Sequence, residues 1–94
     1  MKNNIDISMF VNVNTVEATT CNLVNRFKQR RKELKLSQKE LSKRTDVSYG
    51  SIKRFEHKGD ISLSSLLKLA NTLGTLNEFN DLFDNPLVTS LKDL

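Results

Sequence analysis

Residues 38–59 read QKELSKRTDVSYGSIKRFEHKG, and this stretch decides the fold. Ser37 stands just before it, and Glu40 follows three residues later. A hydroxyl and a carboxylate at this spacing form a capping box, in which each side chain binds an amide at the start of a helix. The sequence therefore predicts a short helix that begins after Ser37 and runs to about Arg44, followed by the turn TDV.

The second half of the stretch predicts another short helix with two different faces. Ser48 is a favourable N-cap, and Gly59 can take the left-handed conformation that ends many helices. Ile52 and Phe55 share the side that would be buried. The opposite stripe is polar and basic, and it consists of Gly50, Lys53, Arg54 and His57. Because Gly50 costs the helix about 0.5–1 kcal/mol relative to alanine, we expect its missing side chain to permit close approach to base edges or phosphates.

Three more helices are predicted around this pair. The first spans roughly residues 20–35 and the fourth spans residues 62–74. A short fifth helix opens on a second capping box, formed by Thr75 and Glu78, and Pro86 ends it. The expected inward positions are Leu23, Val24, Phe27 and Leu34, then Leu63, Leu66, Leu67, Ala70 and Leu73, then Leu76, Phe79, Leu82 and Phe83. The predicted fold class is all-α, a five-helix domain.

Composition and charge limit the class of protein. The 94 residues make one small domain, and the net charge of +4 is unevenly distributed. Residues 26–58 carry twelve Lys and Arg against four Asp and Glu, a net charge of +8, which is typical of proteins that bind polyanions. No apolar run approaches the roughly 18 residues of a membrane span, and the first residues lack the apolar core of a signal peptide. Since the lone Cys21 cannot form an internal disulfide, we expect a cytoplasmic protein.

One charged residue is predicted to lie near the core. Glu56 falls close to the buried side of its helix, where an isolated charge is costly. Arg31 lies one helical turn from both Phe27 and Leu34 and shares their stripe. We therefore predict a half-buried Arg31–Glu56 ion pair that ties the first helix to the third. The alternative is that both side chains are exposed and unpaired.

Two short helices joined by a three-residue turn match the helix-turn-helix, whose second helix enters the DNA major groove. Lys53 and Arg54 can donate to guanine or phosphate, and the hydroxyls of nearby Ser48, Tyr49 and Ser51 add further donors. An ordinary solvated face is the alternative. The residues expected to contact DNA are Gln38, Lys39, Ser48, Tyr49, Gly50, Ser51, Lys53, Arg54 and Lys58.

The same stretch resembles the phage-repressor-like (Xre) helix-turn-helix family, which commonly reads Q-x-x-L-A-x-x-x-G-V-S-x-x-x-I-x-x-x-E. The matching residues are Gln38, Leu41, Val47, Ser48, Ile52 and Glu56. The resemblance covers roughly residues 24–83. It implies that Gln38 contacts the DNA backbone and that the Arg31–Glu56 pair is a family feature. It also implies that bases or adjacent phosphates are faced by Tyr49, Gly50, Lys53 and Arg54.

Two departures from the family pattern affect these expectations. Asp46 stands where the family has its turn glycine, and we expect the turn to persist because Asp tolerates positive φ. Gly50 removes a side chain where the family often reads a base, which weakens the expectation of sequence readout at that position.

The N-terminal residues 5–13 show a different pattern, since every second position from Ile5 to Val13 is apolar. A period of two predicts a strand, and pairing with the same segment of a second chain would satisfy its backbone. The alternative is a flexible tail. We thus expect an N-terminal arm over residues 1–18, a helix-turn-helix domain over residues 19–85 and a C-terminal tail over residues 86–94.

These observations together predict a sequence-specific DNA-binding regulator, a repressor that acts as a homodimer on a double-stranded operator. The resemblance extends to HipB-like antitoxins, which implies a toxin protein as a further partner. The alternative is an adaptor that uses the same helices to bind proteins without reading DNA. One His, one Cys and no phosphate loop leave no constellation for catalysis. We therefore expect no enzyme activity, no cofactor, no metal site and no membrane association.

Overall fold

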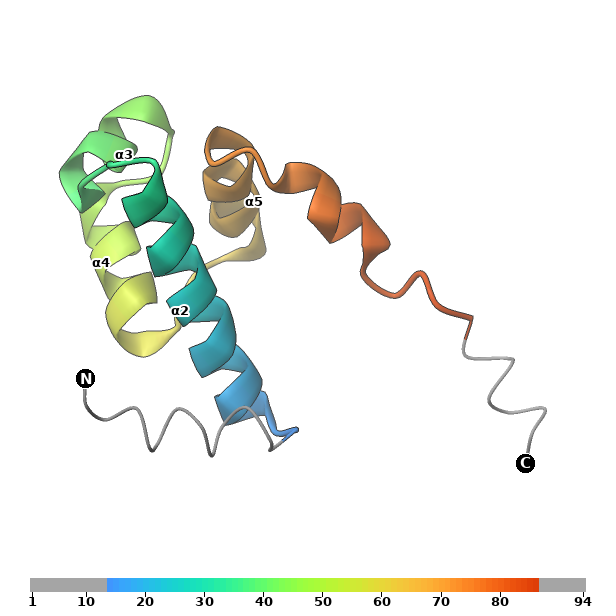
Figure 1. The fold of residues 1–94 in the computed structure, drawn as a ribbon. Coiled ribbons are helices and arrows are strands. Elements are labelled where there is room, and N and C mark those ends of the chain that lie inside the picture. Colours follow the sequence, from blue (N-terminus) through green and yellow to red (C-terminus); the bar gives the residue numbers. More distant parts are fainter. Residues whose placement is uncertain (1–13, 87–94) are drawn as a thin grey trace.

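The computed structural model describes residues 14–86, and its elements carry the labels of Figure 1. Within these residues there are four α-helices and one 3-10 helix, namely α2 (Val16–Glu33), α3 (Gln38–Arg44), α4 (Tyr49–Lys58), α5 (Leu63–Thr72) and η1 (Leu76–Asp81). The prediction of an all-α helix-turn-helix fold is therefore confirmed. The predicted N-terminal strand over residues 5–13 lies outside the described residues.

Hydroxyl side chains set the start of every α-helix. In each case the hydroxyl accepts a hydrogen bond from an amide in the first turn. The four caps are Thr15, Ser37, Ser48 and Ser62. The predicted capping box is present, because the Ser37 amide donates to the Glu40 carboxylate over 2.8 Å and the Glu40 amide donates to the Ser37 hydroxyl over 3.0 Å. With Thr15 as its cap, α2 begins about one turn before the predicted start.

The core forms where α2, α3, α4 and α5 meet. Its largest fully buried side chains are Phe55, Leu41, Ile52 and Leu69. Phe27 of α2 packs edge-on against Phe55 of α4, with ring centroids 5.1 Å apart. Burial of each such side chain contributes about 1.5–3 kcal/mol. This packing holds α4 against α2, and Figure 1 shows η1 extending away from the bundle on the other side of α2.

Gly59 ends α4, and two features of the structure require a glycine at this position. Gly59 has φ 77, in the left-handed region where a side chain is strained. A Cβ at this position would also lie 2.5 Å from Cγ2 of Thr20 in α2. The chain therefore leaves α4 in close contact with α2.

Two expected core positions are wrong. Leu34 and Leu63 have exposed fractions of 46% and 66%. Because α2 ends before Leu34 and Lys35 adopts φ 60, the chain turns and Leu36 enters the core instead. Leu63 is the first residue of α5, and the fully buried position on that helix is Leu69.

The fifth element differs from its prediction in type and in packing. It is a 3-10 helix, and the capping box predicted for Thr75 and Glu78 is wrong. The Thr75 hydroxyl donates to the Ala70 carbonyl over 3.3 Å, so it is used at the end of α5 rather than at the start of η1. Three side chains expected to point inward are exposed, namely Leu76, Leu82 and Phe83.

The turn between α3 and α4 is also made differently from the expectation. In residues 14–86 the non-glycine residues with positive φ are Lys35 and Phe83, so Asp46 does not take the left-handed conformation. Thr45 is extended, with φ −138 and ψ 168. Val47 is buried with 3% exposure and anchors the turn to the core. Asp46 therefore carries no backbone strain of the kind that the family's glycine would relieve.

Candidate nucleic-acid interface

The candidate interface lies on α3, the turn after it and α4. Leu41 and Ile52 are fully buried on the facing sides of the two helices, and Val47 closes the turn between them. These three contacts fix the angle at which α4 leaves the turn. The side of α4 opposite Ile52 is consequently left free of core contacts.

The outer side of α4 is positively charged and open to solvent. Lys53, Arg54, His57 and Lys58 are all exposed. Gly50 is exposed as well, and a Cβ built on it would meet no other atom within 4 Å. The missing side chain therefore serves no packing contact within the described residues. The stripe predicted from sequence forms one continuous surface along the helix.

A second group of polar side chains gathers at the N-terminal edge of α4. The Tyr49 ring has the ammonium of Lys39 at 5.5 Å and that of Lys53 at 5.1 Å from its centroid. Since Lys39 belongs to α3, both helices contribute a cation to one aromatic ring. The Ser48 hydroxyl accepts from the Ser51 amide and donates to the Ser51 hydroxyl over 2.9 Å. Hydroxyls, ammonium groups and a helix start are the donors that bind phosphate groups.

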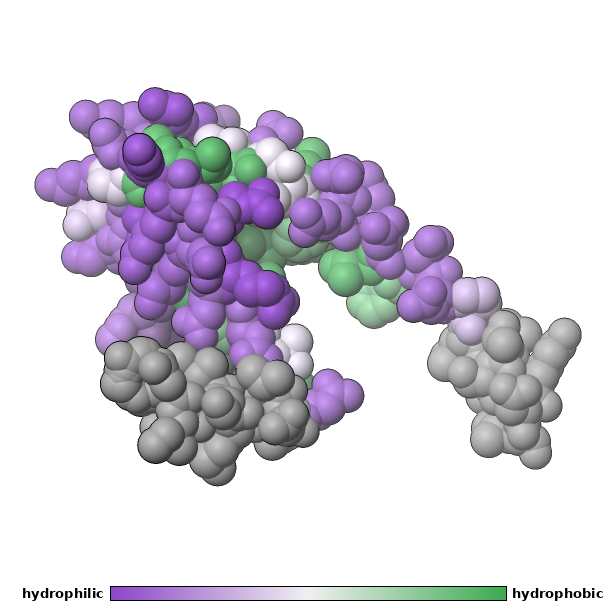
Figure 2. Space-filling model, in the orientation of Figure 1, coloured by the Kyte–Doolittle hydropathy of each residue, from purple (hydrophilic) through white to green (hydrophobic). Residues whose placement is uncertain are grey.

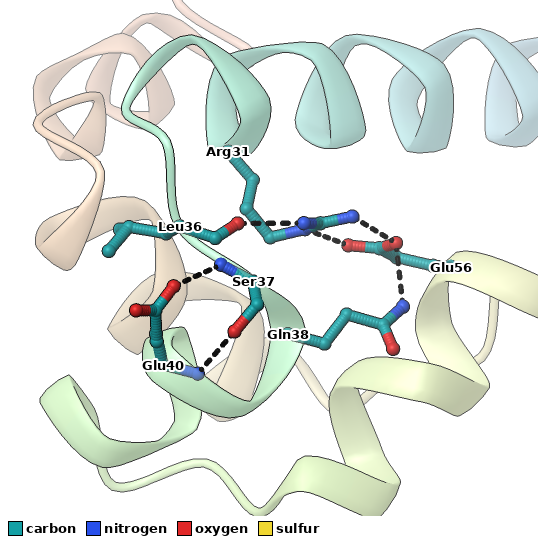
Figure 3. Close-up of polar contacts among 6 residues, drawn as sticks. All are labelled: Arg31, Leu36, Ser37, Gln38, Glu40 and Glu56. Atoms are coloured by element: carbon teal, nitrogen blue, oxygen red, sulfur yellow. Dashed lines mark hydrogen bonds and ion pairs between the residues drawn. The ribbon is translucent and has the colours of Figure 1, made fainter.

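A buried polar network lies behind this surface (Figure 3). Arg31 of α2 donates from Nε to one carboxylate oxygen of Glu56 over 2.7 Å and from Nη2 to the other over 3.0 Å. Its Nη1 donates to the Leu36 carbonyl over 2.8 Å. The Gln38 amide donates to Glu56 over 2.8 Å. The two charged side chains are only 10% and 5% exposed, so Arg31 and Glu56 form the pair proposed from sequence and link α2, α3 and α4.

This network changes the role expected for Gln38. Its side-chain Nε2 is directed at Glu56 inside the fold, so the half-buried amide holds the start of α3 against α4. Lys39, the next residue, is exposed beside Tyr49. The structure therefore groups the predicted residues from Gln38 to Arg54 at the α3 start and on α4. Lys58 lies about 14 Å further along α4, at 1.5 Å per residue from Tyr49.

Sequence reasoning missed one neighbour of the interface. Asp60, just beyond α4, accepts from Nη2 of Arg54 at 3.5 Å. Both side chains are about two-thirds exposed, at 66% and 67%, so this pair contributes little to stability. Asp60 lies after the helix end, and helical periodicity offers no signal for such a contact. The Arg54 guanidinium keeps most of its surface available to a ligand.

No group of three or more His, Cys, Asp or Glu in residues 14–86 is placed to hold a metal ion. None of the helices described is long and apolar enough to cross a membrane.

A helix-turn-helix that presents a basic, solvent-exposed second helix defines a class of DNA-binding regulators. The family model described as Helix-turn-helix matches residues 27–79, which is more than half of the chain and includes α3, α4 and α5. The chain belongs to this family, the phage-repressor-like (Xre) helix-turn-helix family that the sequence motif resembles. No curated protein and no solved structure gives a significant match.

Proposed function

We propose that this DNA-binding regulator is a repressor that recognises a specific duplex operator with α4 in the major groove. The observation that carries the proposal is the outer side of α4, where Lys53 and Arg54 are exposed one helical turn after the exposed Gly50. A lysine or arginine side chain can donate to the acceptors of guanine. A helix with no Cβ at Gly50 can come close to the base edges.

The proposed roles divide between base contact and positioning. Arg54 and Lys53 read bases or adjacent phosphates, because they project from the side of α4 opposite the core. Lys39, with the hydroxyls of Ser48 and Ser51, contacts the DNA backbone at the helix start. The Gln38 side chain holds the start of α3 to Glu56, so its proposed role is to position this helix start against the DNA backbone. In these assignments the base contacts give sequence specificity, and the phosphate contacts fix the position of the protein on the duplex.

We further propose that the repressor acts as a homodimer on an operator with two half-sites about one helical turn apart. A single α4 reads only a few base pairs, and two copies related by a two-fold axis extend the site. The alternating segment of residues 5–13 is the proposed strand that pairs with its copy. The antitoxin role and the toxin partner implied by the family resemblance stay predictions.

The test begins with selection of bound duplexes from a random pool by the purified protein. Fluorescence anisotropy with the selected duplex then gives the affinity over a range of salt concentrations. A repressor with several phosphate contacts should lose affinity steeply as salt rises. The selected sequence should form an inverted repeat. If no duplex is enriched and the affinity is negligible even at low salt, the adaptor alternative is correct.

The variant Arg54→Ala tests whether the DNA-binding surface lies on α4. Loss of a base-reading arginine should cost about 1–3 kcal/mol of operator binding. Arg44→Ala is the matched control, because it removes the same charge from the end of α3, away from the outer side of α4. Equal affinities for these two variants, both folded by circular dichroism, would remove α4 from the reading surface.

A further inference from the structure

A groove runs between α2, α5 and η1. Its volume is about 610 Å³, and its floor is apolar. The floor includes Leu23 and Phe27 from α2, Leu66 from α5, Leu73 directly after α5, and Phe79 from η1. Figure 2 shows apolar residues in the hollow between the bundle and η1. An open apolar surface of this kind commonly marks a place where another protein binds.

The α2 wall of the groove is basic. Arg26 and Arg30 both line it, and Glu78 stands on the η1 wall opposite. Arg30 has an exposed partner, Glu33, with Nε and Oε1 3.5 Å apart. Arg26 is exposed and makes no ion pair within residues 14–86. The α2 wall therefore offers positive charge to an acidic occupant.

The last residue of η1 and the three residues after it have complementary chemistry. Residues 81–84 read DLFD, two carboxylates around two large apolar side chains. Leu82 lines the edge of its own chain's groove and is 59% exposed. Phe83 is 101% exposed, so the rest of the described chain gives it no cover. Phe83 also has φ 64, a conformation that bulky residues rarely adopt. This segment presents an unpartnered aromatic ring between two negative charges.

We propose that the groove is the docking site of a second copy of this chain, and that each copy inserts its residues 81–84 into the groove of the other. Phe83 then covers the apolar floor, while Asp81 and Asp84 face Arg26 and Arg30. The exchange is mutual, so it closes as a two-fold dimer. The inference rests on the proposed dimeric repressor and adds a contact separate from the N-terminal strand.

This docking mode is compatible with the proposed DNA contact. The groove is lined by α2, α5 and η1. In Figure 1 α5 and η1 lie on one side of α2, whereas α4 lies on the opposite side. A second copy seated in the groove leaves the outer side of both α4 helices uncovered. The two-fold axis of the exchange relates the two grooves and leaves two α4 helices free, and a palindromic operator requires two such helices.

Charge reversal tests the exchange directly. One variant combines Asp81→Arg with Asp84→Arg, and the other combines Arg26→Glu with Arg30→Glu. Each should raise the dimer dissociation constant about tenfold or more, because like charges then face each other in both grooves. An equimolar mixture should restore the dimer, since every inserted segment again meets a groove of opposite charge. Sedimentation velocity with a fluorophore on one variant measures this.

The apolar part of the contact has its own matched pair. Phe83→Ser should weaken the dimer about tenfold or more, while Leu63→Ser should leave it unchanged. Leu63 is also a large exposed apolar residue, at 66%, and it does not line the groove. Both variants should keep the helical content of the wild type because both positions are solvent-exposed.

Several results would overturn the inference. The reversed variants could each dimerise like the wild type, or their mixture could stay monomeric. If the dimer is lost without residues 1–13 and its dissociation constant is unchanged by the charge reversals, the N-terminal segment alone forms the dimer contact. If the wild type is a monomer and the protein dimerises only after residues 1–13 are removed, that segment occupies the groove of its own chain and not the second copy. Anisotropy with the selected duplex is independent of all these results, so failure of the DNA-binding proposal is recognised separately.

Discussion

Gly50→Ala should make the protein more stable and a poorer binder of DNA. Apart from its chain neighbours and the backbone of α4 itself, the new methyl group would meet no atom within 4 Å. Gly50 lies in the first turn of α4, so alanine is accommodated without strain. Alanine is favoured over glycine in a helix by about 0.5–1 kcal/mol. The free energy of unfolding should rise by about that amount. For a domain of this size, about 1 kcal/mol raises Tm by several degrees, roughly 4–8 °C.

The effect on DNA should have the opposite sign. If the first turn of α4 touches the base edges, a methyl group at residue 50 forces the helix outward and lengthens the hydrogen bonds of Lys53 and Arg54. Loss of one good base contact costs about 1–3 kcal/mol, which is about a 5- to 150-fold increase in Kd. Urea unfolding and fluorescence anisotropy with the selected duplex measure the two quantities.

Asn71→Ala is the control for this prediction. Asn71 is an exposed residue of α5, so alanine there also raises helix propensity, but at a distance from α4. It should stabilise the fold and leave the affinity for DNA unchanged. The reasoning is refuted if Gly50→Ala binds the duplex as tightly as the wild type. A loss of stability would refute the first half, because it would show that the position does need to lack a side chain within the fold.

Three further predictions concern stability. Glu56→Ala should cost about 3–5 kcal/mol by stranding the buried Arg31 guanidinium, and Arg31→Ala in the same chain should recover part of this; additive losses in urea unfolding would contradict the pairing. The Ser37 amide holds the pKa of the Glu40 carboxyl below its ordinary value of 4.5. The wild type should therefore be more stable than Glu40→Gln above pH 4.5, and this difference in the free energy of unfolding should disappear as the pH falls through the lower pKa of the folded state. Gly59→Ala should destabilise more than Gly74→Ala, because both have left-handed φ but only the first would clash with a neighbour; equal losses of Tm would exclude the clash.

The parts of the fold that were predictable are those with local signals. The box of Ser37 and Glu40 needs only four consecutive residues, and its geometry is present. The contact between Arg31 and Glu56 joins residues 25 positions apart. It was accessible because each residue falls on the inner stripe of its own helix, where an unpaired charge is unfavourable. The additional bond from Gln38 was not accessible, since it depends on how closely α3 approaches α4.

The errors lie where tertiary packing decides. Leu34 fits the α2 stripe by spacing, but the helix ends just before it and Lys35 reverses the chain direction. Leu82 and Phe83 were expected to point inward, yet they follow the end of η1 and are exposed, at 59% and 101%. A periodic pattern shows that a face is apolar, not which surface covers it. The proposed exchange of residues 81–84 would give this face the partner that the pattern anticipates.

The structure gives different explanations for the two glycines of the α4 region, one within the protein and one in a contact with another molecule. In sequence, Gly50 and Gly59 look alike, a glycine near either end of a short helix. Gly59 is explained within the protein, because its φ is 77 and Thr20 occupies the space of a side chain. Gly50 has neither constraint, and its backbone is helical with open space around it. Gly50 lowers helix stability and has no close neighbour among residues 14–86, so we expect its missing side chain to serve a contact with another molecule. Its position between Tyr49 and Lys53 makes duplex DNA the molecule to test.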